Sequence, residues 1–339
     1  MRIYFLSSLI KILHFLPEEF SHHLGLRGLK FLYLMKITNF LLKKNIKTEI
    51  YDKDIRNLPN NLGFAAGLDK NGEYIDCLAA LGVSFIEVGT VTPRPQRGNS
   101  KPRIFRNRKE KSLINRLGFN NKGVNNLVEN LKNKKTNILV GSSIGKNFDT
   151  PNDRASDDYL YCLERVYEYS DYIAINISSP NTQDLRELSK VEHFDSLLKL
   201  IKTKQKNLAE IHGYKPILIK ISPDESSKNL KDICNSILTN RIDGIICSNT
   251  SIDHDYSIEK GGISGKPLKN KATECLRYAR SIIGNELLII ASGGVMNSQD
   301  YIEKIDAGAN LVQIYTGFIF EGPKLIQDIL NLNSTKSNT

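Results

Sequence analysis

The densest group of polar side chains in the chain directly follows the apolar segment 172–177. Five of the seven residues from 176 to 182 can form side-chain hydrogen bonds, namely Asn176, Ser178, Ser179, Asn181 and Thr182. Because a strand buried on both faces can direct its last side chains toward one ligand, this run predicts a small-molecule site. An Asx or Ser/Thr turn that only closes the strand is the simpler alternative.

Lys220 is a second candidate, because it interrupts the apolar run 216–221. Lysine is almost never fully buried without a partner. A Lys220 that points into the protein therefore predicts either an anionic ligand or a paired acid. The alternative is a lysine at an edge that extends its charged end to solvent.

Glycines gather after the last three apolar runs of the chain. The positions are Gly261, Gly262, Gly265, Gly293, Gly294 and Gly317. Glycine lets the backbone approach a ligand closely, and backbone N–H groups bind phosphate. One glycine pair usually marks only a turn, but three such sites in succession predict a phosphate-bearing cofactor. The chain has no G-x-G-x-x-G motif, which argues against a Rossmann nucleotide domain.

Eight short apolar runs alternate with segments of helical periodicity and must position these groups. The runs span residues 62–66, 84–91, 137–142, 172–177, 216–221, 243–247, 287–291 and 311–315. Strands that alternate with helices in this way predict an α/β fold of the (β/α)8 TIM-barrel type. The active sites of such barrels lie at the carboxyl ends of the strands, and the polar run and the glycines fall there.

The composition narrows the function classes. The chain has 339 residues, of which 40% are hydrophobic, and a formal net charge of +10. Residues 1–50 hold eight Lys and Arg against three Glu, which leaves +5 in this segment alone. A basic balance is compatible with nucleic acid, an anionic membrane or anionic ligands. The five cysteines are scattered and His spacings are irregular, so we expect neither a metal site nor a disulfide framework.

Two apolar and basic segments, 3–16 and 20–36, open the chain. The first is shorter than the ~20 residues that a membrane-spanning helix needs. Both have helical spacing with one apolar face, which predicts amphipathic helices in a membrane interface. Helices packed on the main domain are the alternative. A secretory signal is disfavoured because Pro17, Glu18 and Glu19 follow without an A-x-A site.

Six motifs in a fixed order make the chain similar to the quinone-dependent class of the dihydroorotate dehydrogenase family. They span residues 65–70, 89–96, 115–121, 176–182, 261–265 and 312–317. The resemblance covers roughly residues 50–330. It implies oxidation of (S)-dihydroorotate to orotate in pyrimidine (UMP) biosynthesis, with FMN as hydride acceptor and a membrane quinone as final electron acceptor.

The resemblance also implies roles for individual residues. Ser179 is the expected catalytic base, at a position where the cytosolic class carries Cys. FMN is expected to contact Ala66, Gly67, Leu68, Asp69, Lys70, Thr90, Ser143, Asn176, Lys220, Ser248, Gly265, Gly294, Tyr315 and Thr316. Dihydroorotate is expected to contact Lys70, Asn115, Arg116, Leu117, Gly118, Phe119, Asn181, Asn249 and Thr250. Arg106 and Tyr315 are the candidates for the quinone site.

Ser143 departs from the family pattern. The family usually has an Asn there that contacts the flavin, and Ser is shorter. A bridging water, Ser142 or Asn147 is then expected to replace that contact.

The resemblance divides the chain into three parts: a membrane and quinone-access segment at 1–45, a catalytic barrel at 46–332 and a disordered tail at 333–339. We expect a monomer without a nucleic-acid partner. It is expected to lie peripherally on the cytoplasmic face of a bacterial membrane. The mitochondrial inner membrane is disfavoured because no transit peptide is recognised.

Two other functions compete with this interpretation. A flavin barrel that reduces uridine in tRNA would suit the basic charge. Such an enzyme is expected to carry a Cys acid where this chain has Ser179. A non-catalytic scaffold at the membrane surface would be expected to have lost Lys70, Ser179 or Lys220, and the chain keeps all three.

Overall fold

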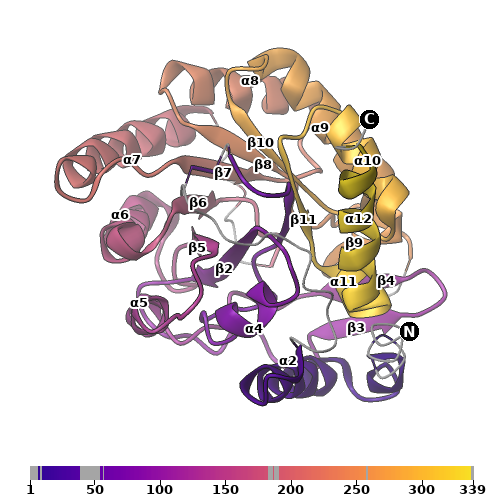
Figure 1. The fold of residues 1–339 in the computed structure, drawn as a ribbon. Coiled ribbons are helices and arrows are strands. Elements are labelled where there is room, and N and C mark those ends of the chain that lie inside the picture. The colour runs from indigo at the N-terminus through magenta and orange to yellow at the C-terminus, as the bar shows by residue number, and fades with distance from the viewer. Residues whose placement is uncertain are drawn as a thin grey trace.

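Eight parallel strands form a closed barrel in the computed structural model, which describes residues 7, 10–38, 54, 55, 57–181, 186, 191–256 and 259–336 (Figure 1). Around the barrel they are β1 (Leu62–Phe64), β2 (Phe85–Val91), β5 (Leu139–Ile144), β6 (Tyr172–Asn176), β7 (Ile217–Ile221), β8 (Gly244–Cys247), β10 (Leu288–Ser292) and β11 (Leu311–Ile314). The predicted (β/α)8 fold is confirmed, and every strand ends within two residues of its predicted limits.

Helices surround the barrel (Figure 1). They are α4 (Ile75–Ala79), α5 (Val124–Lys132), α6 (Ala155–Val166), α7 (Val191–His212), α8 (Ser227–Thr239), α9 (Lys269–Ile283), α10 (Ser298–Asp306), α11 (Thr316–Glu321) and α12 (Pro323–Lys336). Short 3-10 helices lie at Asn152–Arg154, Tyr167–Tyr169 and Lys266–Leu268. Helix α12 continues four residues into the predicted tail 333–339, and residues 337–339 lie outside the described part.

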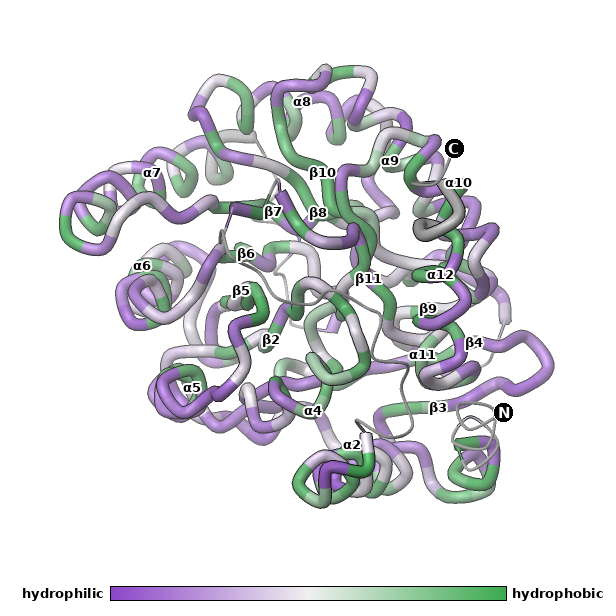
Figure 2. Tube along the Cα trace, in the orientation of Figure 1, coloured by the Kyte–Doolittle hydropathy of each residue, from purple (hydrophilic) through white to green (hydrophobic). Residues whose placement is uncertain are grey.

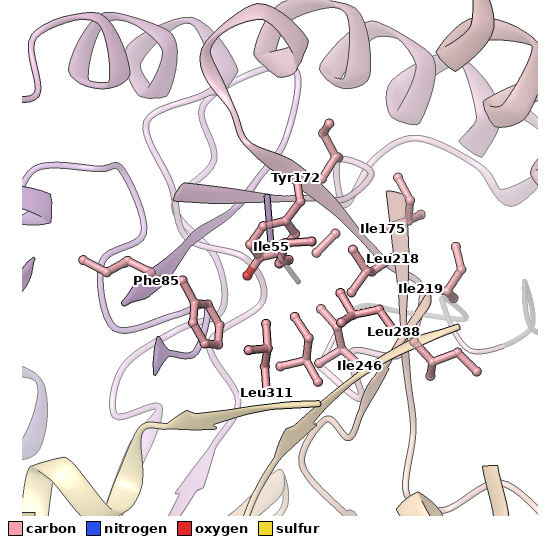
Figure 3. Close-up of a cluster of buried hydrophobic side chains, with 14 of the residues drawn as sticks. Ile55, Phe85, Tyr172, Ile175, Leu218, Ile219, Ile246, Leu288 and Leu311 are labelled. Carbon is pink, nitrogen blue, oxygen red and sulfur yellow. The ribbon is translucent and has the colours of Figure 1, made fainter. Parts of the chain in front are cut away.

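The strands are continuous apolar runs because both of their faces are buried (Figure 2). Large side chains fill the interior, as Figure 3 shows for Phe85 and Tyr172. Two strand glycines make room for these rings. A Cβ at Gly63 would lie 2.5 Å from the ring of Phe85, and one at Gly141 would lie 2.0 Å from the ring of Tyr172.

A small antiparallel sheet lies outside the barrel and was not predicted. It consists of β3 (Ile104–Asn107), β4 (Ser112–Asn115) and β9 (Gly262–Gly265), in the order β3-β4-β9. In its register Asn115 lies opposite Gly262. The sheet therefore joins the predicted substrate loop to the first glycine-rich segment.

Helix α2 (Glu18–Leu34) follows Pro17 and packs against α4 and β3 at the lower edge of Figure 1. Its first turn carries Glu18 and Glu19, which favour the positive end of the helix dipole. Before it, residues 10–13 are helical, while residues 1–6, 8, 9 and 39–45 of the predicted N-terminal segment lie outside the described residues. None of the helices in the described ranges combines the length and apolar character that spanning a membrane requires.

Candidate functional site

A cavity opens at the carboxyl ends of the barrel strands, where the sequence predicts the chemistry. The structure brings most of the predicted site residues together around it. Those that line it are Ala66, Gly67, Lys70, Thr90, Asn115, Leu117, Gly118, Phe119, Asn176, Ser179, Asn181, Lys220, Ser248, Asn249, Thr250, Gly265, Gly294, Tyr315 and Thr316. They come from separate strands and from the segments that follow them, so only the closed barrel makes them neighbours.

Four predicted contact residues do not line this cavity. Leu68 is packed in the core, and the Asp69 carboxylate accepts hydrogen bonds from the backbone N–H groups of Glu73 and Tyr74 at 2.9 and 2.7 Å. Burial raises the pKa of Asp69 to about 6. Arg116 points away from the cavity and pairs with Glu259 at 2.8 Å. Ser143 is the fourth.

Ser143 forms a hydrogen bond with Thr90, which lines the cavity. Its Oγ lies 2.8 Å from Oγ1 of Thr90, and Asn176 donates to the same Thr90 oxygen at 2.9 Å. Ser142 pairs with Ser170 at 2.7 Å, and Asn147 donates to Gln96 Oε1 at 2.8 Å. Neither Ser142 nor Asn147 is among the residues that line the cavity.

Four asparagine side chains form two hydrogen-bonded pairs beside the cavity. Asn181 donates to Oδ1 of Asn115 at 3.0 Å, and Asn249 donates to Oδ1 of Asn176 at 3.3 Å. A carboxamide offers both donors and acceptors, and these hydrogen bonds fix the orientation of the NH2 group and the oxygen of each amide. Such an arrangement suits a planar ligand that carries both carbonyl and N–H groups.

Ser179 is buried, with 6% of its surface exposed, and it lines the cavity. Its Oγ accepts a hydrogen bond from the backbone N–H of Asn181 at 3.3 Å. This bond uses a lone pair and leaves the hydroxyl proton available. Thr182, the last residue of the polar run, lies outside the described residues.

Lys70 contributes a positive charge to the cavity. Its Nζ donates to the carbonyl oxygen of Gly67 at 3.0 Å. The pKa of Lys70 is lowered to about 8, mainly by burial and then by the positive charge of Arg103, while the charges of Glu19 and Asp69 oppose this shift. Lys70 can therefore bind an anion at neutral pH and loses that ability in mild alkali.

Glu87 is the functional residue that the sequence interpretation missed. Its Oε1 lies 3.5 Å from Nζ of Lys220, and both side chains are almost fully buried. Its Oε2 accepts hydrogen bonds from Gln313 at 2.8 Å and from Tyr172 at 3.1 Å. Lys220 thus has a paired acid and also lines the cavity. A lone acid within the apolar run 84–91 is the signal that could have identified it.

Two of the glycines that line the cavity also make room for protein backbone. A Cβ at Gly294 would lie 2.2 Å from Cα of Lys269, and one at Gly317 would lie 2.1 Å from the carbonyl oxygen of Val295. Gly294 therefore allows the loop after β10 to lie against the start of α9. Gly317 allows α11 to lie against the loop after β10.

A second cavity lies between α2 and the barrel. Lys70, Ile104, Leu117 and Tyr315 line both cavities, so these side chains form their shared wall. The other predicted quinone residue, Arg106, is not among the residues lining either one. It donates to the carbonyl oxygen of His14 at 2.9 Å and to Oγ of Ser21 at 2.7 Å. It therefore joins β3 to the N-terminal helical segment.

Known proteins resemble the chain along nearly its whole length. A sequence profile described as "Dihydroorotate dehydrogenase" matches residues 46–334. "Dihydroorotate dehydrogenase (quinone)" of Shewanella sediminis is 48% identical over 327 residues, which cover 94% of this chain and 96% of the relative. The protein of that name from Aliivibrio salmonicida is 46% identical over 323 residues, with coverage of 93% and 96%. The crystal structure of ligand-free DHODH from Eimeria tenella has a TM-score of 0.79 at 32% identity, covering 92% of this chain and 95% of that one.

Proposed function

The chain belongs to the dihydroorotate dehydrogenase family, and on this basis we propose that it oxidises (S)-dihydroorotate to orotate, in pyrimidine biosynthesis, with a quinone as the final electron acceptor. The observation that carries the proposal is the cavity that combines Ser179, Lys70 and the paired asparagines. Orotate carries a carboxylate and ring amide groups, which match a lysine and carboxamides. The relatives of known name support the same reaction rather than tRNA reduction or a scaffold.

FMN is the proposed cofactor, and the residues present fit it. Lys220, Thr90, Asn176 and Ser248 would face the flavin ring, and Gly265, Gly294 and Thr316 would lie near its phosphate. Oε1 of Gln313 is buried, lies on a residue that lines the cavity and has no hydrogen-bond partner among the described residues. An unpaired buried acceptor of this kind suits a ligand N–H group. Bound FMN would supply the hydride acceptor for the reaction.

The protein groups divide the remaining work. Lys70 would bind the carboxylate of dihydroorotate, and the asparagines would orient its ring amides. Ser179 would take the proton from C5 of the substrate while its own hydroxyl proton passes to a relay. Serine is a weak base, so this role depends on a closed site from which water is excluded. Lys220 would stabilise negative charge at the cofactor.

The rate constant kcat/KM for dihydroorotate should fall at alkaline pH. Lys70 has a pKa lowered to about 8, so it loses its charge as pH rises through that value and no longer attracts the substrate carboxylate. We expect a decline of about tenfold per pH unit above pH ~8. Steady-state kinetics from pH 6 to pH 10 measure it. The Lys70→Arg variant keeps its charge up to pH 10, so its kcat/KM should no longer fall with pH if the variant binds substrate. A wild-type kcat/KM that does not change with pH would contradict the role of Lys70.

Quinone access and membrane contact are proposed for the N-terminal segment. Phe20, Leu24, Phe31 and Leu34 of α2 are 43–62% exposed and recur at helical spacing. Exposed apolar groups along one face of an amphipathic helix are typical of a segment that lies in a membrane interface. The cavity beneath α2 shares Tyr315 with the main cavity, so it lies directly beside the proposed flavin site. We place the protein, as a monomer, peripherally on the cytoplasmic face of a bacterial membrane.

Replacing Phe20 and Phe31 by serine should weaken binding to anionic lipid vesicles by about tenfold or more, because each ring loses part of its apolar contact with lipid. Cosedimentation with vesicles measures the effect. The matched control is Ile211→Ser on α7, a side chain that is 75% exposed on another part of the protein. Equal loss in the control would indicate nonspecific adsorption, and no loss in the double variant would remove α2 from the membrane contact.

An anaerobic absorption spectrum of the purified protein, before and after adding dihydroorotate, tests the function. Flavin absorbance that bleaches and returns on adding a quinone would support both half-reactions. If the flavin absorbance does not bleach, FMN remains the proposed cofactor but dihydroorotate is excluded as the substrate. A protein that takes up no flavin would reject the cofactor as well.

A further inference from the structure

A nearly buried ion pair joins α2 to the barrel. Nη2 of Arg103 lies 2.7 Å from Oε1 of Glu19, and Nε lies 3.3 Å from Oε2. The two side chains are only 7% and 17% exposed. Two parallel N–H···O contacts between a guanidinium and a carboxylate fix geometry as well as charge. The pair is therefore a specific joint between the N-terminal segment and the segment 97–103.

Arg103 also determines the shape of the segment to which it belongs. Its Nη1 donates to the carbonyl oxygens of Arg97 and Asn99, at 2.5 and 3.0 Å. Gly98 adopts a φ of +72°, and a Cβ there would lie 2.2 Å from the carbonyl oxygen of Leu117. The guanidinium thus holds segment 97–103 in a bend that packs directly on the substrate loop 115–119.

Hydrogen bonds continue from this segment into both loops that carry the paired asparagines. Asn99 donates from its backbone N–H to the carbonyl oxygen of Leu117 at 3.1 Å. Its side chain donates to the carbonyl oxygens of Arg116 and Asn181, at 2.9 and 3.3 Å. Asn99 therefore lies between the loop of Asn115 and the loop of Asn181, the two residues that bond to each other at the cavity.

The charges around Lys70 also link α2 to the cavity. The charges of Asp69, Glu19 and Arg103 all shift the pKa of its ammonium group. The charge of Lys70 in turn lowers the pKa values of His22 and His23 of α2. The pKa of His22 is lowered to about 3, mainly by burial, so His22 is neutral. Glu19 then supplies the negative charge from α2 that offsets Arg103 beside Lys70.

We propose that Glu19 is a positioning residue for the dihydroorotate site. By neutralising and orienting Arg103, it fixes segment 97–103, and Asn99 of that segment holds the loops of Asn115 and Asn181. Helix α2 then serves substrate affinity as well as membrane and quinone contact. This inference rests on the proposed function, because it concerns the affinity of the same site for dihydroorotate and orotate.

Glu19→Gln in the FMN-loaded, full-length protein tests it. Orotate is titrated into the oxidised enzyme and binding is followed by the change in flavin absorbance. We expect the Kd for orotate to rise roughly tenfold, while the bleaching rate at saturating dihydroorotate stays within about twofold. The matched control is Glu18→Gln, in the same helical turn. The charge of Glu18 raises the pKa of Arg106, whereas Arg103 forms its ion pair with Glu19. The Kd of Glu18→Gln for orotate should equal that of the wild type.

A double variant separates positioning from general damage to the fold. If Glu19 acts through Arg103, Glu19→Gln/Arg103→Gln should bind orotate no more weakly than Arg103→Gln alone. Glu19→Asp should restore part of the affinity. An unchanged Kd in Glu19→Gln, or additive losses in the double variant, would overturn the inference. If Glu19→Gln does not fold, Arg103→Lys must show the same weakening, and wild-type affinity there would overturn it too. A wild-type flavin that orotate does not perturb would instead reject the proposed function.

Discussion

Replacing Ser179 by alanine should slow the bleaching of bound flavin by saturating dihydroorotate about 10²–10⁴-fold at neutral pH. The hydroxyl is the group at this position that can accept the substrate proton, and alanine removes it. FMN should remain bound, because the variant changes only one oxygen at the edge of the cavity. The backbone N–H of Asn181 loses its acceptor, but Asn181 is partly exposed, so the fold should tolerate the change.

Anaerobic stopped-flow spectroscopy measures the bleaching rate directly and keeps quinone reduction out of it. Ser179→Cys should retain more activity than Ser179→Ala, because a thiol can also accept the proton. Ser178→Ala is the neighbouring comparison. Ser178 Oγ contacts Nδ2 of Asn249 at 3.1 Å, so its loss should weaken orotate binding rather than proton removal. A bleaching rate equal to that of the wild type in Ser179→Ala would exclude Ser179 as the base.

The barrel could be predicted because its strands are buried on both faces. Burial on two sides selects continuous apolar runs, which are visible without any knowledge of partners. The sheet β3-β4-β9 left no such signal. β3 includes Arg106 and Asn107, and β4 pairs with β9, which lies about 150 residues further along the chain. A pairing between distant short strands depends on the completed barrel, so local sequence does not encode it.

The individual residues of the site could be predicted, but the ion pairs and hydrogen bonds between them could not. Ser179, Asn181 and the glycines follow strands, so the barrel rule places them at one end. Glu87 lies in one strand and Lys220 in another, and only closure of the barrel makes them a pair. Similarly, nothing around Arg103 in the sequence indicates that Glu19 would reach it. Gly294 and Gly317 line the cavity as expected, but the sequence did not indicate that each also allows a close approach of protein backbone.

Replacing Lys220 by methionine should destabilise the FMN-free protein by about 3–5 kcal/mol, because it leaves the Glu87 carboxylate buried without its cation. Glu87 has no exposed surface, so water cannot solvate it in place of the lysine. Tyr172 and Gln313 would still donate to Oε2, but Oε1 would lose the contact with Nζ. A shift of the urea unfolding midpoint, measured on FMN-free protein, reports the loss.

The double variant Glu87→Gln/Lys220→Met distinguishes an unpaired charge from poor packing. Both ions are then absent, and the oxygen of the amide introduced at position 87 can still accept hydrogen bonds from Tyr172 and Gln313. Most of the lost stability should therefore return, since removing both partners of a buried ion pair is far less costly than removing one. FMN affinity should stay low in both variants, because each lacks the Lys220 ammonium. A double variant as unstable as Lys220→Met would show that the methionine side chain, and not the isolated carboxylate, causes the loss.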